Sequence, residues 1–165
     1  MSSNIGELFA TKYVVAYSSV PETAMTGVSA YPASAAYLDV SPYERVHIIA
    51  SFGTIHGSDS PVLTPKQTDS VSGTLDAVDS TTTGAYTPNV TTGDNLSYVW
   101  TIEVADLATD HHFVALQTSG TLTNGTYVHV VILGEPKSLP ATQSSTIVYG
   151  HYYKAGGQAV ATVVS

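Results

Sequence analysis

The segment SYVWTIEV at Ser97–Val104 decides the fold class, because its side chains repeat with the two-residue period of a β-strand. One face of this strand carries only large apolar and aromatic side chains: Tyr98, Trp100, Ile102 and Val104. The other face carries Val99, Thr101 and Glu103. We therefore predict that the first face lies on a hydrophobic core, with these companions from other segments: Ile48, Val114 and Val130.

Similar extended segments occur on both sides of this strand. They are rich in β-branched and aromatic residues and are bounded by turn residues, as strands are. They are Thr11–Val20, Arg45–Phe52, Phe113–Thr118, Thr126–Leu133 and Thr146–Tyr153, the last broken at Gly150. One short helical turn is expected within Val104–Asp110. This pattern predicts an all-β protein, built as a single β-sandwich or jelly-roll-like domain.

The segments between and beyond the strands differ in character. Ser58–Lys66 contains two prolines and is expected to be a polar connection, and Ser80–Asn95 an exposed loop or loose hairpin. We predict an N-terminal arm at Met1–Ala10 and a sandwich domain over residues 11–155. A C-terminal tail would begin at the hinge Gly156-Gly157 and end at Ser165.

The C-terminal region is the part most suited to binding another protein. Residues 158–165, QAVATVVS, carry no charged side chain. Such a segment is expected either to pair as a strand with a neighbouring protein or to form the last strand of its own sheet. Tyrosines crowd just before it, and interfaces favour tyrosine. The predicted interface residues are Tyr149, Tyr152, Tyr153, Val160, Val163 and Val164.

Composition and charge exclude several classes of function. Only 11% of the 165 residues are charged, the net charge is −8, and five Lys and Arg residues cannot form the basic patch that nucleic acids require. With no cysteine, there is no disulfide framework and no thiolate zinc site. No apolar run approaches the length of a membrane span, and the start of the chain does not resemble a signal peptide. We expect synthesis in a cytoplasm, with no nucleic-acid or membrane partner.

The sequence gives little support for catalysis or metal binding. Of the six histidines, His111 and His112 are adjacent, and neighbours on a strand point to opposite faces. His129 is expected to lie on the pleat of its strand with a hydrogen-bonded ring. The nucleophile elbow Gly-x-Ser-x-Gly and the phosphate-binding Gly-rich loop are both missing from the sequence. We expect a non-enzymatic protein without metal or cofactor.

Three blocks of sequence carry a resemblance to a known family. They are SPVLTPKQTDSVSGT at Ser60–Thr74, YVWTIEVADLATDHHFVALQTSG at Tyr98–Gly120, and YVHVVILGEPKSLPAT at Tyr127–Thr142. In content and order these blocks resemble the head decoration, or cement, proteins of tailed bacteriophages. In those proteins the first block is an extended strand followed by a turn, the second a strand, an Asp-Leu turn and another strand, and the third a closing strand.

The resemblance implies a structural protein of the virion. Such a protein would bind the outer surface of the capsid, bridge major capsid protein subunits and associate with itself, often as a homotrimer. Two other binding roles fit the same composition: a component of the phage tail or fibre, and a carbohydrate-binding adhesin module. A β-sandwich hydrolase is the remaining possibility and has the least support in the residues.

Overall fold

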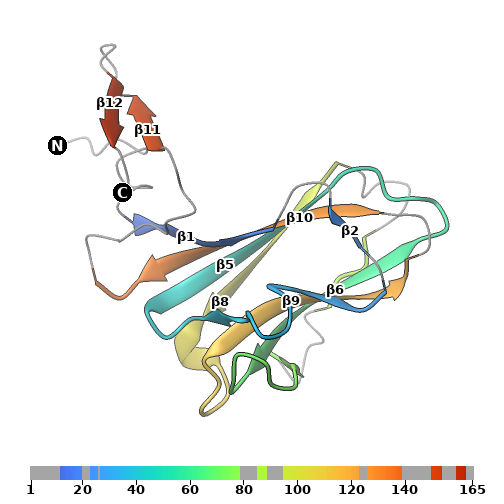
Figure 1. Ribbon diagram of the computed structural model, residues 1–165, viewed down its shortest axis with the longest axis horizontal. Helices are drawn as coiled ribbons and strands as arrows, with labels where there is room; N and C mark the ends of the chain where they lie inside the picture. The colour runs from blue at the N-terminus through green and yellow to red at the C-terminus, as the bar shows by residue number, and fades with distance from the viewer. Residues whose placement is uncertain are drawn as a thin grey trace.

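Two antiparallel β-sheets pack face to face, which confirms the predicted all-β sandwich (Figure 1). The computed structural model describes residues 12–19, 23–25, 27–78, 85–88, 95–122, 126–138, 150–153 and 159–162. Both sheets contain five strands. In both sheets, alternate side chains point into the space between the sheets.

Sheet A is built around the longest strands of the chain. Its strands run in the order β1 (Val14–Ser18), β10 (Tyr127–Pro136), β5 (Tyr43–Phe52) and β8 (Ser97–Glu103), and β2 (Thr23–Ala24) also pairs with β10. All these pairs are antiparallel. The four longer strands overlap the segments that the sequence predicted, although β5 begins two residues earlier and β10 ends three residues later than expected.

Sheet B covers the other side of the core. Its strands run in the order β3 (Ser29–Tyr31), β9 (Phe113–Thr121), β6 (Ser60–Thr68) and β7 (Asp76–Ala77), and β4 (Leu38–Asp39) also pairs with β9. The chain passes from sheet A to sheet B after β2, β5 and β8, and it returns after β4, β7 and β9. The predicted helical turn is present as a 3-10 helix, η1 (Val104–Asp106), directly after β8.

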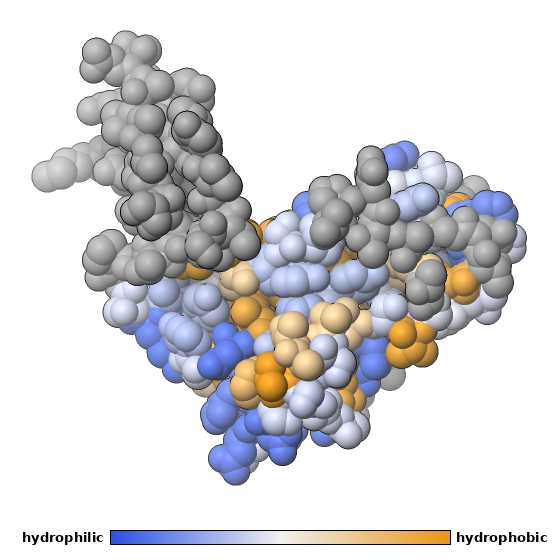
Figure 2. Space-filling model, in the orientation of Figure 1, coloured by the Kyte–Doolittle hydropathy of each residue, from blue (hydrophilic) through white to orange (hydrophobic). Residues whose placement is uncertain are grey.

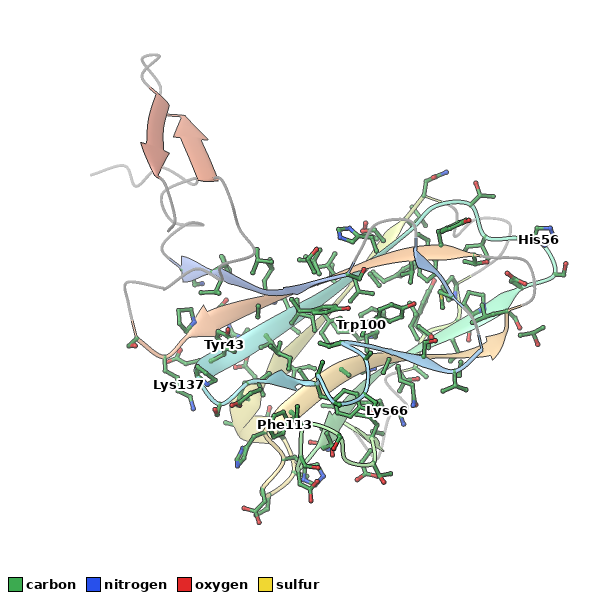
Figure 3. The ribbon with its side chains drawn as sticks, in the orientation of Figure 1. Tyr43, His56, Lys66, Trp100, Phe113 and Lys137 are labelled. Atoms are coloured by element: carbon green, nitrogen blue, oxygen red, sulfur yellow. The ribbon has the colours of Figure 1, made fainter. Side chains whose placement is uncertain are left out.

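The core lies between the sheets and contains the predicted residues. Ile48, Val114 and Val130 are fully buried, and Ile102 is nearly so. Trp100 and Val104 are partly buried and pack against this cluster, and Figure 3 shows Trp100 between the two sheets. The predicted inward face of Ser97–Val104 is therefore confirmed, although its tryptophan is not fully enclosed.

Strand β6 corrects the expectation that Ser58–Lys66 is a polar connection. Pro61, Leu63 and Pro65 all point inward and are buried, so the segment has the two-residue period of a strand. The backbone N–H of Leu63 donates to Tyr86 O on the side of β6 away from β9. Pro61 and Pro65 have the same orientation, so their missing N–H groups fall on that side and the pairing with β9 stays intact.

The described part of the C-terminus forms a hairpin of its own. Strand β11 (Gly150–Tyr153) pairs antiparallel with β12 (Ala159–Thr162), and both are separate from sheets A and B (Figure 1). The pairing crosses the predicted hinge at Gly156-Gly157. Strand β11 begins at Gly150, where the sequence predicted a break.

Candidate interaction surface

The outer face of sheet A, which points away from the core, carries an ordered set of side chains. The strand register places them in four rows across β10, β5 and β8. The rows are Glu135–Arg45–Glu103, Leu133–His47–Thr101, Val131–Ile49–Val99 and His129–Ser51–Ser97. Neighbouring side chains in such rows lie close enough to interact. Formal charge is confined to the first row, with His47 beside it.

The first row is an ion-pair network centred on Arg45. Its guanidinium binds Glu103 Oε1 through Nε and Nη2, and its Nη1 lies 3.5 Å from Glu135 Oε2. Lys12, just before β1, places its Nζ 3.5 Å from Glu135 Oε1. These charges neutralise one another within the protein, so this row offers few free charges to a ligand.

Glu135 is the most enclosed member of this network, with 8% of its surface exposed. Burial raises the pKa of this carboxyl, but hydrogen bonds from His47 and Tyr13 and the charges of Lys12 and Arg45 together hold it below its usual value. His47 bridges rows, since its Nε2 lies 3.1 Å from Glu135 Oε1 and its Nδ1 lies 3.0 Å from Oγ1 of a threonine in β8. The arrangement is that of a structural ionic cluster.

The third and fourth rows carry no formal charge. Val99 in the third row is 61% exposed, beside half-buried Ile49 and Val131. In the fourth row, the hydroxyls of Ser51 and Ser97 lie 2.7 Å apart. This part of sheet A can bind a partner through apolar contact and hydrogen bonds, and it has no charges that would have to be desolvated.

The histidines that the sequence singled out serve the fold. His129 Nε2 lies 3.1 Å from Ser18 Oγ, which confirms the predicted hydrogen-bonded ring. His111 and His112 lie in the loop before β9, outside the strand predicted at Phe113–Thr118, so the argument that a strand points them to opposite faces does not apply to them. His111 Nε2 lies 3.6 Å from Asp76 Oδ2, and His112 donates its backbone N–H to Thr68 O. In the part of the chain that the structure describes, no group of three or more His, Asp or Glu residues could hold a metal ion.

The predicted interface residues fall in and around the C-terminal hairpin. Tyr152 and Tyr153 are in β11, and Val160 is in β12 opposite Tyr152. Tyr149, Val163 and Val164 lie outside the described residues. The structure therefore brings the segments of three predicted residues together as one hairpin, apart from the outer face of sheet A.

Gln67 is a structural residue whose role the sequence did not reveal. It belongs to the first block of the family resemblance, and its Nε2 donates to Ala77 O at 2.9 Å. Its Oε1 accepts from the backbone N–H of Ala108, in the second block, also at 2.9 Å. In the same turn, a Cβ on Gly73 would collide with the side-chain oxygens of Thr68 and Ser70. These motif residues hold the loops of sheet B together.

Comparison with known proteins adds no relative. No protein-family model matches the chain, and a search of curated proteins gives no match. Among the described residues, no helix is long and apolar enough to cross a membrane.

Proposed function

We propose that this chain is a non-enzymatic structural protein of a tailed-phage head, which binds the outside of the capsid and bridges major capsid protein subunits. It would assemble as a homotrimer on the virion. No cofactor is needed, because each copy would act only by burying surface across a joint between subunits, and many weak contacts add up over a shell.

The observation that carries this proposal is a surface that combines exposed apolar side chains, among them Leu96, Val99 and Tyr127, with uncharged polar groups. On sheet A, the hydroxyls of Ser51 and Ser97 lie beside these residues, and the nearby charges are already paired with one another. A surface of this kind suits contact with another protein. A fold alone does not select among functions, so the surface is the stronger argument.

The three blocks of the family resemblance also support the proposal. They contain β6, then β8 and β9, then β10, and they form parts of both sheets. Gln67 from the first block binds the backbone of the second, and β6 pairs with β9 along nine residue pairs. The blocks therefore make up one packed unit, as segments of a shared fold would.

The test is to add the purified full chain to heads of a phage that encodes it, prepared from a mutant lacking this gene. Sedimentation followed by mass spectrometry measures how many copies bind per head. Saturable binding to heads, with copies in a fixed ratio to capsid subunits, is the expected result. Capsids of an unrelated phage serve as the control.

Other outcomes would redirect or remove the proposal. Binding to purified tails and not to heads would favour the tail or fibre role. Retention on a glycan array without binding to either part of the particle would favour the adhesin module. A chain that stays in the supernatant with both heads and tails would refute a structural role in the particle.

A further inference from the structure

The sandwich has two ends, and the strand connections define them. At one end lie the start of β5, the end of β8 and the start of β9, with segments 39–44, 69–76, 103–112 and 135–138. At the other end lie the end of β5 and the start of β6, with residue 25 and segments 27–29, 53–60, 95–97, 121–122 and 126–127. Figure 3 shows Tyr43 and Lys137 near the first end and His56 at the second.

Among the described residues, formal charge is confined almost entirely to the first end, here called the acidic end. On and beside it lie eight acidic and four basic residues of the described chain: Asp39, Glu44, Asp69, Asp76, Glu103, Asp106, Asp110, Glu135, Lys12, Arg45, Lys66 and Lys137. Figure 2 shows a group of strongly hydrophilic residues over the loop that follows β8. Apart from Asp59, the remaining charged residues are Glu7, Glu22, Asp79, Asp94 and Lys154, which lie outside the described residues.

The second end, here called the uncharged end, has the opposite character. Within the described ranges its one acidic or basic residue is Asp59, which is 1% exposed and accepts a hydrogen bond from Thr126 Oγ1 at 2.8 Å. Asp59 therefore holds two loops together beneath the surface. It presents no charge to the outside.

Exposed apolar side chains gather at this same end. Six large hydrophobic residues are exposed in the part of the chain that the structure describes, and four of them are on or near the uncharged end: Val28, Tyr86, Leu96 and Tyr127. Leu96 and Tyr127 flank the end of β5 from its two sides, since Leu96 O accepts from Phe52 N and Tyr127 precedes the partner of Phe52.

Tyr86 is held in this group by a stack of aromatic rings. Its ring centroid lies 4.4 Å from that of Tyr98, which in turn lies 5.9 Å from that of Phe52. Burial, together with the adjacent Tyr86 phenol, raises the pKa of Tyr98 to about 12. The exposed Tyr86 is thus fixed by the core behind it.

We propose that the protein stands end-on on the capsid, with the uncharged end against the major capsid protein and the acidic end toward solvent. The inference rests on the proposed function and specifies the docking surface and its chemistry. The partner patch on the shell would be uncharged and apolar, because burying unpaired charges costs far more than burying apolar groups. The acidic ends of neighbouring copies would repel and stay hydrated.

A side-on arrangement, with the outer face of sheet A against the shell, is the alternative that the test must separate. Val99 is central to that face and 61% exposed, whereas Leu96 and Tyr127 are at the uncharged end and 46% and 50% exposed. Val71 offers a matched control, because it is 43% exposed but lies in the loop after β6 at the acidic end.

The experiment adds one charge at each position and measures binding to heads by sedimentation. Leu96→Asp and Tyr127→Asp are expected to weaken binding at least about tenfold, since each would place an unpaired carboxylate in the contact. Val71→Asp and Val99→Asp are expected to leave it within about twofold. Circular dichroism melts of all four variants check folding, which exposed substitutions should not disturb.

The outcomes separate this inference from the proposed function. If the unaltered chain does not bind heads, the proposed function fails and the orientation with it. If it binds, weakened binding of the Val99→Asp variant alone would establish the side-on arrangement and overturn the inference. Weakened binding of the Val71→Asp variant alone would show that the acidic end faces the shell. Unchanged binding of both Leu96→Asp and Tyr127→Asp would also overturn the inference.

Discussion

The two ends of the sandwich are built from the same kind of loop, yet they differ in what they expose. At the acidic end the loops carry their charges outward, and side chains such as Gln67 tie the loops together through the backbone. At the uncharged end the one described carboxylate, Asp59, is buried and links two loops through its hydrogen bond from Thr126. Leu96 and Tyr127 are exposed there.

The difference separates two physical requirements that one surface cannot meet well. Charged side chains keep a protein hydrated and apart from its copies. Apolar groups bind a protein surface with no charge to desolvate, and hydroxyl groups do so where the partner replaces their hydrogen bonds to water. With only 11% of its residues charged, the chain places most of those described at one end. The contrast between the two ends should affect the free energy of unfolding most strongly.

The largest stability effect is expected from glycines that differ between the ends. Gly120, near the uncharged end, has φ +95° and its Cβ would strike the backbone carbonyl of Ser60. Gly73, at the acidic end, would meet side-chain oxygens, which can move. We predict that Gly120→Ala lowers the free energy of unfolding by about 3 kcal/mol and Gly73→Ala by about 1 kcal/mol.

Urea unfolding of the two variants measures this difference. Gly53→Ala is the control, because its Cβ would have open space, and it should change stability by less than about 1 kcal/mol. Equal losses of unfolding free energy in Gly120→Ala and Gly73→Ala would show that the backbone at Gly120 can move away from the carbonyl of Ser60.

The next largest difference in unfolding free energy is expected between the loss of a buried aspartate and the loss of an exposed one. Asp59→Ala leaves the Thr126 hydroxyl without its acceptor in a buried place, so we predict a loss of about 2 kcal/mol in unfolding free energy. Asp106→Ala removes an exposed carboxylate at the acidic end and should change stability by less than about 0.5 kcal/mol. Comparable losses, measured by the same urea titration, would contradict the structural role given to Asp59.

Glu135 should make stability depend on pH. Its pKa is lowered in the folded protein, so its contribution is present above the ordinary carboxyl pKa and is lost as the pH falls through the lowered folded value. Glu135→Gln should cost about 1–2 kcal/mol at pH 7, through unsatisfied partners, and flatten the acid side of the stability curve.

Glu103→Gln is the matched control, since Glu103 binds the same arginine but its side chain is 44% exposed. It should cost less than about 1 kcal/mol at pH 7, because solvent screens an exposed ion pair. Thermal melts at pH 7 compare the two variants, and melts between pH 3 and pH 7 follow the pH dependence of Glu135→Gln. An equal loss of stability in both variants at pH 7 would mean that the enclosure of Glu135 has no energetic consequence.

The smallest effect on stability is expected from neutralising the acidic end. The triple variant Asp69→Asn, Asp106→Asn, Asp110→Asn should unfold within about 1 kcal/mol of the unaltered chain, because all three side chains are exposed. Its copies should repel each other less at low salt, and 0.5 M salt should remove the difference. Small-angle scattering at several protein concentrations measures this. Unchanged repulsion at low salt would show that the acidic end does not keep copies apart.

The sequence predicted the class of fold because strands such as Ser97–Glu103 alternate between side chains that are enclosed or half-buried and side chains that face outward. It failed at β6, where prolines fill inward positions and hide the alternation. The location of the uncharged end could not be predicted from the sequence. Its members come from segments as distant as Val28 and Tyr127, and only the sheet register brings them to one end.

The interface predicted at the C-terminus had a local signal, a run of tyrosines before an uncharged tail. That signal correctly marked a strand at Tyr152–Tyr153 but carried no information about its place relative to the sandwich. The rows on the outer face of sheet A were harder to predict from the sequence, because half-buried residues such as Ile49 and Val131 cannot be told from core residues by their type. Their exposure depends on which face of the sheet is covered.

A cryo-electron microscopy reconstruction of heads saturated with this protein tests the end-on arrangement most directly. We predict that each copy contacts the shell through loops 53–60 and 126–127, with Leu96 and Tyr127 buried against major capsid subunits. Loops 69–76 and 103–112 should be the parts farthest from the shell. A sandwich lying on sheet A, or one with its acidic end on the shell, would contradict the account.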